Sequence, residues 1–577
     1  MNKKVIENLD LSFKGTLRND VRTTFCSISD ELRGPFTQLV NNVSEPLKSN
    51  LDWWVESTSS RNSLASPLYH YYCCFHFFDY LVNERIKISE IKVDSRALKK
   101  LLQCYCKLHS LDYKVDVTGK TQSSRLKKLL SACMLIYNVG KEEYYKLLCA
   151  KKTKYLSEDL PKKPLTLIDT FIIPGFINKD RYYEGLWQNL TEKQRETTFF
   201  VSTLALIPLN DYEKTFKLLR TNPRKFLIKE DYLSLSDIFY SLFHCIRIFF
   251  IKINPIFVFN VDFSPLIREE IFSMRGYVNA FESLLNYRFA RKLKKKGVNI
   301  RLVVDWFENQ VIDKGWNIGF NKFYPETMTK GYRGIVPAYQ YLSQWSPTIV
   351  EMEGGVLPKQ INVIGKKFVE PSKEFAHNIN VSVAPAFRFQ YLWNDNTNNV
   401  ESNNYNILVA LSIILSESLN ILQLLHDTIN DGYLNDYKIL IKPHPTMEIE
   451  TIKRGFRRKW PSEFKIVDGE AKDYLKKCSL LISGMSSICL ESMALAIPVV
   501  VCENPSGLSY NTIPLDVPNE LWRSCKTIDE IIQAIEYFEN RSTQTIRKHQ
   551  KLCNQIKKDY FEPVTKESVY RFLELEG

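Results

Sequence analysis

Two apolar segments in the last third of the chain each end in a short polar turn, and this pair constrains the fold more than any other feature. The first, residues 439–445, reads ILIKPHP, and the second, residues 480–501, reads LLISGMSSICLESMALAIPVVV. In the second, the turn at 484–487 leads into a predicted helix that carries Glu491. Strand, turn and helix form the unit of a parallel α/β sheet, whose strands end at one shared edge. The two turns are therefore predicted to line one pocket.

The side chains of these turns suit a bound phosphate. Lys442 and His444 end the first strand, and the hydroxyls of Ser486 and Ser487 precede the helix after the second. Backbone N–H groups at a helix start, hydroxyls and an imidazole all offer hydrogen bonds to phosphate oxygens. We predict that His444 offsets the charge of a departing phosphate, although the serines alone are also typical of simple helix caps. Such a pocket suits a nucleotide-activated donor, which carries a phosphate. The residues predicted to bind this donor are Lys442, Pro445, Gly484, Ser486, Ser487, Glu491 and Arg388.

The same alternation of apolar runs and helical segments extends along the chain. Strands are predicted at 165–168, 198–202 and 300–304, and further strands follow at closer spacing. Helical segments between them predict an α/β protein with two Rossmann-like, doubly wound domains that face a cleft. The later predicted strands are 347–351, 360–363, 381–384, 407–413, 437–441, 464–467, 480–483 and 499–501.

Composition and the positions of glycine and proline divide the chain into three predicted parts. Residues 1–365 form an N-terminal, acceptor-binding domain, with a basic helical insertion at about 118–160. Residues 366–560 form the C-terminal domain that binds the nucleotide-sugar. The last helix, in residues 561–577, is a candidate to cross back over the first domain. A chain of 577 residues agrees with this division, because a single core rarely exceeds about 250–300 residues.

The net charge of +13 predicts anionic partners, such as phosphates, acidic glycans or an acidic membrane surface. Nucleic acid is not an expected partner, because no nucleic-acid-binding motif accompanies the charge. The densest basic run, RFARKLKKK at 288–296, is a candidate contact with acidic lipid. A solvated helix face is the commoner explanation for such a run.

The cysteines and the start of the chain predict a cytoplasmic location. The 13 cysteines show no paired CxxC spacing with histidine, so free thiols are expected rather than a zinc site. The first residues lack the apolar stretch of a leader peptide. The most apolar segment, 240–261, is interrupted by charged residues and Pro255 and is not expected to span a bilayer. Peripheral attachment to the inner membrane is the alternative to free solution.

Two carboxylates follow the predicted strand at 300–304. The segment 303–310 reads VVDWFENQ and places Asp305 and Glu308 at the strand end, where carboxylates suit general-base or nucleophile chemistry on a sugar. The alternative is that both side chains cap a helix or pair with Lys314 or Arg333. The turn at 351–354, EMEG, also carries acids, but it lies beside the predicted hinge, and we prefer Glu308.

Three further residues are predicted to bind the acceptor: Asp169, Arg181 and Tyr182. They follow a predicted strand, where acids and aromatic rings offer groups that bind hydroxyls and stack on a sugar. A surface ion pair between Asp180 and Arg181 is the alternative. Arg388 follows the strand at 381–384, where it is placed to bind the donor phosphate or a sugar carboxylate.

The order of these features resembles that of known proteins. The strand, Ser-rich turn, acidic helix and strand at 480–501 resemble the donor half of GT-B glycosyltransferases. The His444-Pro445 and Ser486-Ser487 pairs resemble the donor motifs of bacterial sialyltransferases, polysialyltransferases and β-Kdo transferases. Most of the chain from about 169 to 505 resembles bacterial proteins of surface carbohydrate biosynthesis, of O-antigen or capsule type. The segments that carry this likeness are 306–324, 358–365 and APAFRF at 384–389.

The resemblance implies a GT-B glycosyltransferase that moves a sugar from a nucleotide-sugar to a surface-polysaccharide acceptor, which is a glycan or a lipid-linked glycan. The favoured donor is a CMP-activated sugar acid such as Kdo or a sialic-type sugar. No metal and no cofactor are expected, because basic groups replace a cation at the phosphate. The alternatives are a CDP-polyol phosphotransferase of teichoic-acid type and a non-catalytic module that binds nucleotide or glycan in a polysaccharide assembly complex.

Overall fold

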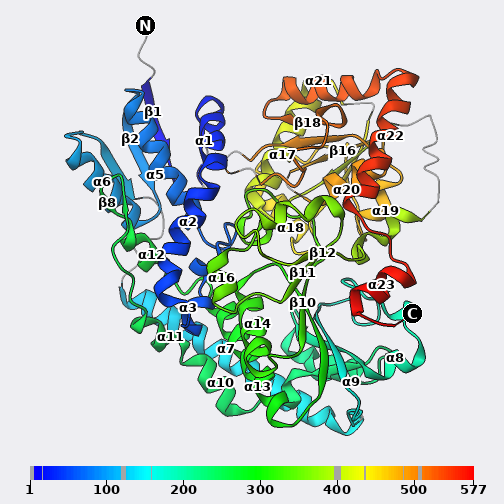
Figure 1. Ribbon diagram of the computed structural model, residues 1–577. Coiled ribbons are helices and arrows are strands. Elements are labelled where there is room, and N and C mark those ends of the chain that lie inside the picture. The colour runs from blue at the N-terminus through cyan, green and yellow to red at the C-terminus, as the bar shows by residue number, and fades with distance from the viewer. Residues whose placement is uncertain are drawn as a thin grey trace.

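The computed structural model describes residues 5–13, 15, 17–117, 125–157, 159–394, 405–434, 437–484, 486–504, 508 and 510–576. Within these ranges, the strands form three parallel sheets and one antiparallel pair, β7 (Phe257–Val258) with β8 (Val261–Asp262). Figure 1 shows an N-terminal layer in blue on one side of the molecule. A first α/β unit in cyan and green lies below, and a second unit in yellow to red lies above it.

The first unit is built on a parallel sheet with the order β12-β11-β10-β9-β4-β5-β6 among the described residues. All residues of β5 are buried, as expected for a strand in a parallel sheet that is covered on both faces. The early strands run outward from β4 and the later strands run outward from β9, so the strand order reverses between these two neighbours. The strands are β4 Leu165–Ile172, β5 Thr198–Leu204, β6 Phe226–Ile228, β9 Ile300–Trp306, β10 Met328–Arg333, β11 Gln360–Val363 and β12 Val381–Val383.

The second unit has a parallel sheet with the order β15-β14-β13-β16-β17-β18 in the part of the chain that the structure describes. Numbered along the chain, this order is 3-2-1-4-5-6, the order of the Rossmann fold, and the first sheet adds one strand to the same pattern. Two such units around one pocket form the GT-B architecture, so the predicted fold class is confirmed. The strands are β13 Asn406–Ala410, β14 Lys438–Lys442, β15 Phe464–Ile466, β16 Leu480–Ser483, β17 Val499–Cys502 and β18 Trp522–Cys525.

Helices connect the strands of both units. Those of the first are α8 Glu192–Thr197, α9 Tyr212–Arg220, α10 Leu235–Leu242, α11 His244–Arg247, α12 Ser264–Ile271, α13 Tyr277–Lys295, α14 Val311–Phe323, α15 Leu342–Trp345 and α16 Ile349–Glu353. Those of the second are α17 Leu415–Asn430, α18 Ile449–Gly455, α19 Lys472–Leu475, α20 Ile488–Ala494 and α21 Ile528–Glu539, before α22 Thr543–Tyr560 and α23 Lys566–Leu573. Gly315 of α14 allows a close helix crossing, because a Cβ there would lie 1.8 Å from the Ser283 carbonyl oxygen of α13.

The stretch predicted as one N-terminal domain, residues 1–365, contains one small parallel sheet and all but one strand of a second. The remaining strand, β12, pairs with β11 although it lies beyond the predicted boundary at residue 365. The smaller sheet pairs β1 (Val5–Asp10), β2 (Lys87–Val93) and β3 (Lys114–Val117). Its helices are α1 Asn19–Glu31, α2 Arg33–Ser44, α3 Leu51–Trp54, α4 Ser57–Ser60, α5 Leu68–Asn83 and α6 Arg96–Leu108. We call residues 5–117 the N-terminal layer. Alternating strands and helices predict parallel sheets, but they do not show where one sheet ends and the next begins.

The predicted helical insertion at about 118–160 contains one long helix, α7 (Arg125–Thr153), which leads from the N-terminal layer into the first unit. It does not stand apart as a separate subdomain. Its residues Cys149 and Ala150 are buried against α9, and its Gly140 lies against the side chain of Leu242 in α10. The helix therefore forms part of the outer surface of the first unit.

The segment 347–351, predicted as a strand, is helical instead. Thr348 Oγ1 accepts the backbone N–H of Glu351 (3.2 Å), and the Glu351 carboxylate accepts the backbone N–H of Thr348 (2.8 Å). This reciprocal capping box starts α16. The apolar residues Ile349 and Val350 favoured a strand, but the Thr-x-x-Glu signature has the stronger local hydrogen bonds.

The last residues of the chain lie on the first unit. Gly365 meets the end of α22 so closely that a Cβ there would lie 2.3 Å from the backbone of Tyr560. The N–H of Glu562 then donates to the carbonyl of Ile364 (2.7 Å), and α23 places Phe572 5.3 Å from the ring of Tyr332 in β10. Figure 1 shows α23 in red beside the strands of the first unit.

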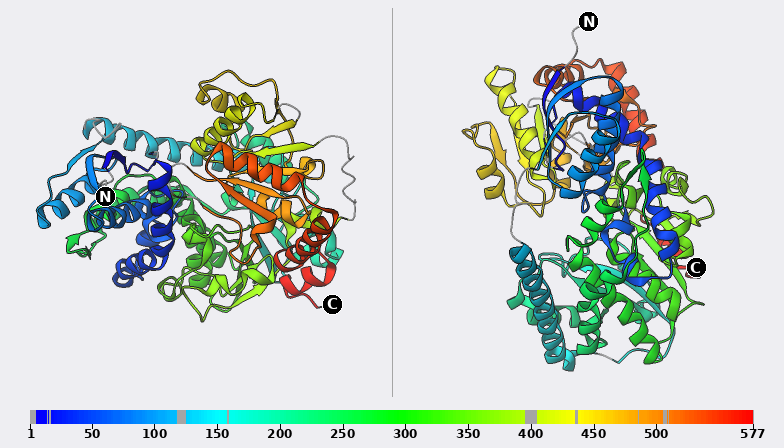
Figure 2. Two further views of the ribbon diagram at one scale, coloured as in Figure 1. Left: turned by 90° about the horizontal axis from the view of Figure 1, so that it is seen from above. Right: turned by 90° about the vertical axis from the view of Figure 1, so that its left-hand side faces the viewer.

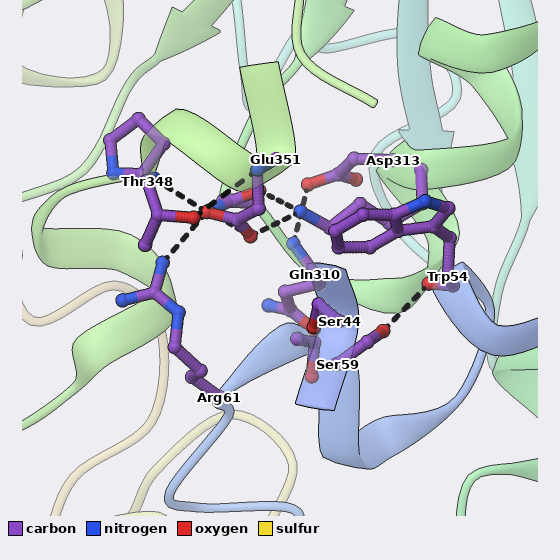
Figure 3. Close-up of polar contacts among 12 residues, drawn as sticks. Ser44, Trp54, Ser59, Arg61, Gln310, Asp313, Thr348 and Glu351 are labelled. Atoms are coloured by element: carbon purple, nitrogen blue, oxygen red, sulfur yellow. Dashed lines mark hydrogen bonds and ion pairs between the residues drawn. The ribbon is translucent and has the colours of Figure 1, made fainter. Parts of the chain in front are cut away.

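A buried charge network joins the N-terminal layer to the first unit (Figure 3). The Glu351 carboxylate pairs with Arg61 of the N-terminal layer (2.9 Å) and with Lys314 of α14 (2.6 Å). All three side chains are buried. Burial alone would raise the pKa of Glu351, but the charges of Arg61 and Lys314 lower it to about 2. Glu351 is therefore a structural anion rather than a base that faces a cleft.

The network predicts a large effect of one charge on stability. Glu351→Gln keeps the shape of the side chain but leaves two buried cations without an opposing charge. We expect the free energy of unfolding, measured by urea denaturation at pH 7, to fall by about 3–5 kcal/mol.

A neighbouring acid provides the matched control. Glu353 is exposed, and its one ion pair among the described residues is with Lys48 on the surface (3.2 Å). Glu353→Gln is expected to change the same free energy by less than about 1 kcal/mol. Equal losses in the two variants would contradict the role given to the buried network.

Candidate functional site

A pocket of about 460 Å³ lies at the carboxyl edge of the second sheet. It sits where the strand order reverses between β13 and β16, the position at which open α/β sheets bind ligands. The turns after β13, β14, β15 and β16 all reach it. Residues between 176 and 184 of the first unit form the opposite wall, together with Arg388, Phe389 and Tyr391 of the linking segment.

The donor residues predicted from the two turns gather around this pocket. The turn after β16 is held in place, because Ser483 Oγ donates to the Ala410 carbonyl (2.8 Å) and Thr512 Oγ1 donates to the Ser486 carbonyl (2.7 Å). Gly484 lies within this turn but is not part of the pocket wall. The residues predicted for the donor site that line the pocket are Lys442, His444, Pro445, Ser486, Ser487, Glu491 and Arg388. Arg181, which was predicted to bind the acceptor, lines this pocket as well.

Glu491 is fixed by two hydroxyl groups. Its carboxylate accepts hydrogen bonds from Ser487 Oγ (2.9 Å) and from the hydroxyl of Tyr391 (2.5 Å). Tyr391 belongs to the linking 3₁₀ helix η10 (Phe387–Trp393), so this contact ties the linker to the donor turn. Sequence reasoning did not find Tyr391, because the two residues lie 100 positions apart and no motif connects them.

Three cations of the pocket have no ion pair with any described carboxylate: Arg181, Arg388 and Lys442. The predicted alternative for Arg181, a pair with Asp180, is wrong, because Asp180 pairs with Arg224 (2.7 Å). Burial and the neighbouring charge of Arg388 lower the pKa of Arg181, and burial lowers the pKa of Lys442. Like charges held together without a counter-charge indicate a site for an anion.

The imidazole of His444 adds a neutral donor to these cations. Its Nδ1 accepts the backbone N–H of Thr446 (3.2 Å), so the neutral ring carries its proton on Nε2. Burial, followed by the charges of Arg181 and Lys442, lowers the pKa of His444 to about 4. At neutral pH the ring therefore offers one N–H and no charge, until a bound anion offsets the two cations.

Ion pairs bridge the rim of the pocket between the two units. Lys179 of the first unit pairs with Glu470 of the second (2.5 Å), and Lys472 pairs with both Glu470 (3.0 Å) and Glu184 (3.6 Å). These pairs use the carboxylates of the rim and leave the inner cations free for a ligand. The sequence showed no signal for them, because the partners come from separate sheets.

Glu308 lies next to a second, smaller hollow but does not line it. This hollow of about 200 Å³ shares Ser486 and Ser487 with the donor pocket and is also lined by Gln344. Gln344 Nε2 donates to Glu308 (2.8 Å), as do Gln310 Nε2 (2.6 Å) and the indole of Trp306 (3.0 Å). The predicted pairing of Glu308 with Lys314 or Arg333 does not occur among the described contacts.

Asp313 and Lys314 hold the turn that carries Glu308. Asp313 accepts the backbone N–H groups of Glu308 and Gln310 (2.9 Å each), and Lys314 donates to Asn309 (2.5 Å). Asn309 itself has a left-handed backbone, with φ +54°. The Glu351 network therefore also supports this turn, because Lys314 bonds both groups.

The other predicted acids are inside the protein. Asp305 is buried and accepts a hydrogen bond from Asn317 (2.7 Å), and burial together with the charges of Asp313 and Asp169 raises its pKa far above the usual value. Asp169 is also buried, which raises its pKa to about 7. Neither lines the donor pocket, and Tyr182 packs on the Trp306 ring at 4.6 Å. Apolar strand neighbours hide these side chains, so we retain Glu308 as the candidate acid.

Sequence reasoning missed Glu417, a buried carboxyl beside the donor turn. It lies on the first turn of α17, is 3% exposed, and neither of its oxygens has a hydrogen-bond partner by distance and angle. A Cβ placed on Gly484 would lie 3.5 Å from its Oε2. Burial raises the pKa of Glu417 to about 7, with the Ser412 hydroxyl opposing the shift. Glutamate is common in helices, so only the tertiary contacts identify Glu417 as an unusual carboxyl.

The basic run at 288–296 is partly used inside the structure. Arg288 (2.6 Å) and Lys292 (2.9 Å) both pair with the buried Asp237, and Arg288 lies over the Tyr240 ring.

Within the ranges that the structure describes, no helix has the length and hydropathy needed to cross a bilayer. Those ranges also contain no group of three or more His, Cys, Asp or Glu side chains arranged for a metal ion.

Comparison with known proteins gives structural likenesses only. No protein-family model matches the sequence, and no curated protein matches it. Among solved structures, the S. aureus MnaA-UDP co-structure overlaps 72% of this chain and 98% of its own, with 11% identity and a TM-score of 0.43. The α,α-trehalose 6-phosphate synthase from Burkholderia multivorans overlaps 71% and 98% (9% identity, TM-score 0.41). The UDP-GlcNAc 2-epimerase from Methanocaldococcus jannaschii overlaps 71% and 99% (11%, 0.40).

Glu417 predicts a pH-dependent stability effect. Its pKa in the folded protein, about 7, lies above the ordinary value of 4.5, so the folded state holds the proton more tightly. The stability of the wild type therefore falls as the pH rises from 4.5 to 7. We expect Glu417→Gln to raise the free energy of unfolding at pH 8 by on the order of 3 kcal/mol, with little change at pH 4.

Thermal unfolding at the two pH values is the measurement. Glu450→Gln is the control, because Glu450 is exposed and its one ion pair in the described part of the chain is with Lys453 (3.5 Å). The assignment fails if Glu417→Gln destabilises the protein at pH 8, or if the control shows the same pH dependence.

Proposed function

We propose that this protein is a glycosyltransferase that takes its sugar from a nucleotide-sugar bound in the pocket of the second unit. One observation carries the proposal: three cations that pair with no described carboxylate, and the Nε2–H of His444, converge at the strand-order reversal of a Rossmann-like sheet. Such a position suits the phosphate of a nucleotide. Because the opposite wall of the pocket comes from the first unit, the sugar of the bound donor would lie between the two units.

The donor we favour is a CMP-activated sugar acid, such as Kdo or a sialic-type sugar. This choice rests on the likeness of the His444-Pro445 and Ser486-Ser487 pairs to the donor motifs of enzymes that use such sugars. The charges agree with it, because a CMP-linked sugar acid carries one phosphodiester and one carboxylate. Arg388 is suited to the carboxylate, since a guanidinium binds planar anions through two parallel hydrogen bonds.

In the proposed reaction, Glu308 takes the proton of an acceptor hydroxyl as its oxygen bonds to the anomeric carbon. The bond from that carbon to the phosphate oxygen breaks, and the electron pair leaves with the nucleotide. Lys442, His444 and Arg181 offset the charge that develops on the phosphate. The acceptor we propose is a surface-polysaccharide glycan, free or lipid-linked.

The first test removes the neutral donor at the phosphate. His444→Ala is expected to lower kcat by about 10²-fold or more with the correct donor, because a preorganised hydrogen bond to the leaving group is lost. Transfer is measured by mass spectrometry with a panel of CMP-, CDP-, UDP- and GDP-linked sugars. We expect turnover of a CMP-linked sugar acid.

His377→Ala is the matched control, since His377 is exposed and outside the pocket. Full activity of His444→Ala with every donor would contradict the site. Turnover of CDP-polyols alone would favour polyol-phosphate transfer, and nucleotide binding without turnover of any donor would favour a non-catalytic module.

The second test concerns the acid. Glu308→Gln is expected to lower kcat by about 10²–10⁴-fold while the dissociation constant of the nucleotide, measured by calorimetry, stays unchanged. The reason is that Glu308 lies outside the donor pocket and acts on the acceptor. The control is Glu326→Gln, at an exposed position. An unchanged kcat in Glu308→Gln would remove Glu308 from the mechanism.

A further inference from the structure

The smaller hollow, of about 200 Å³, lies where all three parts of the molecule meet. Ser63 of the N-terminal layer marks this junction. Its Oγ donates to the Gln340 carbonyl of the first unit (2.9 Å), and its own carbonyl accepts the hydroxyl of Tyr510 from the second unit (2.7 Å). Figure 2 shows the N-terminal layer, in blue, next to both units. The hollow therefore has walls from each of the three parts.

The smaller hollow adjoins both groups that the proposed reaction needs. It shares Ser486 and Ser487 with the donor pocket, so the two spaces meet at the donor turn. Another of its lining residues, Gln344, donates through Nε2 to the Glu308 carboxylate (2.8 Å). A molecule in the hollow is therefore next to the donor turn and next to the candidate base, as an acceptor has to be for its hydroxyl to attack.

The chemistry of the smaller hollow differs from that of the donor pocket. None of the described side chains that line it carries a charge, whereas Arg181, Arg388 and Lys442 line the donor pocket. Two of its hydroxyls, those of Thr512 and Tyr510, already donate to backbone carbonyls. Its apolar side chains come from all three parts: Leu64, Ile335, Val336, Ala338, Ile413 and Ile414.

Such a space disfavours an acidic sugar. A carboxylate placed there would lose water without gaining a cation, and the Glu308 carboxylate nearby would repel it. Arg333 does not compensate, because it is 1% exposed and does not line the hollow. Burial lowers the pKa of Arg333 to about 10, and the charges of Glu308 and Glu351 oppose this shift, so its charge already faces two acids.

The size and the apolar lining favour a single neutral sugar. A space of about 200 Å³ has room for one sugar ring and not for a longer stretch of glycan. One face of a sugar ring is formed by C–H groups, and an acetamido substituent adds a methyl group. Both pack favourably on aliphatic side chains such as Ile335, Val336 and Ile413.

We propose that the smaller hollow is the acceptor subsite, and that it takes the terminal acceptor sugar as an uncharged residue with an apolar substituent such as an acetamido group. This inference rests on the proposed glycosyltransferase function and names its acceptor class. A hydroxyl of this sugar replaces the Gln344 amide at Glu308 and gives its proton to that carboxylate. Its oxygen bonds to the anomeric carbon of the donor as the bond to the phosphate oxygen breaks.

The first measurement compares methyl β-glycosides that differ in one group. The panel consists of the glycosides of N-acetylglucosamine, N-acetylgalactosamine, glucose, galactose, glucuronic acid and galacturonic acid. Their binding to the full chain is followed by saturation-transfer difference NMR. We expect an N-acetylated glycoside to bind at least about tenfold more tightly than the glycuronides, with the plain hexosides between them. The same panel is assayed by mass spectrometry for transfer from CMP-linked sugar acids.

The second measurement places a charge in the hollow. Ile413 lines it and is 52% exposed, so Ile413→Glu adds a carboxylate without disturbing a core. We expect this variant to bind the N-acetylated glycosides at least about tenfold more weakly, while the dissociation constant of CMP, measured by calorimetry, stays unchanged.

Leu515→Glu is the matched control, because Leu515 is 75% exposed and lines neither space. It makes the same change of charge and should bind the glycosides like the wild type. Both variants should keep the wild-type unfolding temperature.

The outcomes separate the subsite from the proposed function. The subsite is overturned if no neutral glycoside binds, if the glycuronides bind or accept sugar as readily, or if Ile413→Glu binds the glycosides like its control. Equal binding of the plain and N-acetylated hexosides would overturn the apolar substituent. None of these results affects turnover of the donor. Conversely, the expected glycoside binding without turnover of any donor would contradict the glycosyltransferase and leave the hollow as a site for neutral sugars.

Discussion

The arrangement of this molecule depends most on the buried ion pairs that the Glu351 carboxylate forms. Arg61 comes from the N-terminal layer and Lys314 from the first unit, and each would be a buried charge without a counter-ion if Glu351 were absent. Lys314 also bonds Asn309, in the turn that carries Glu308. One ion cluster therefore connects the packing of the N-terminal layer with the position of the candidate acid.

The donor pocket follows from a second constraint, the common edge of parallel strands. Turns that are far apart in the sequence meet there because all strands of a sheet end on the same side. The pocket gathers Arg181 from one unit, Arg388 from the linker and Lys442 from the other. Burial opposes the charges of Arg181 and Lys442, and the charge of Arg388 also opposes that of Arg181. A bound anion would offset both effects, which is the physical basis of the proposed affinity for a nucleotide phosphate.

Burial separates the acids that look equivalent in the sequence. Asp305 and Glu308 are three residues apart at one strand end, yet Asp305 is enclosed by the sheet and Glu308 reaches neutral donors beside a hollow. A fully enclosed carboxyl cannot reach a substrate, whereas Glu308 is held by the side-chain amides of Gln310 and Gln344, and Gln344 lines the hollow. Phe249 and Phe250 show the opposite case, because there side chains usual for a core lie at the surface.

The sequence by itself determined the α/β class, most strand positions and the two donor turns, because strand periodicity and turn composition are local properties. It also marked Ser486, Ser487, His444 and Lys442, which the structure brings to one pocket. Only the tertiary structure decided that the first 365 residues divide between two sheets, that 347–351 is helical, and that Asp305 and Asp169 are buried. It alone revealed Tyr391 and Glu417. These features depend on contacts between residues distant in the chain, and such contacts leave no periodic or local signal.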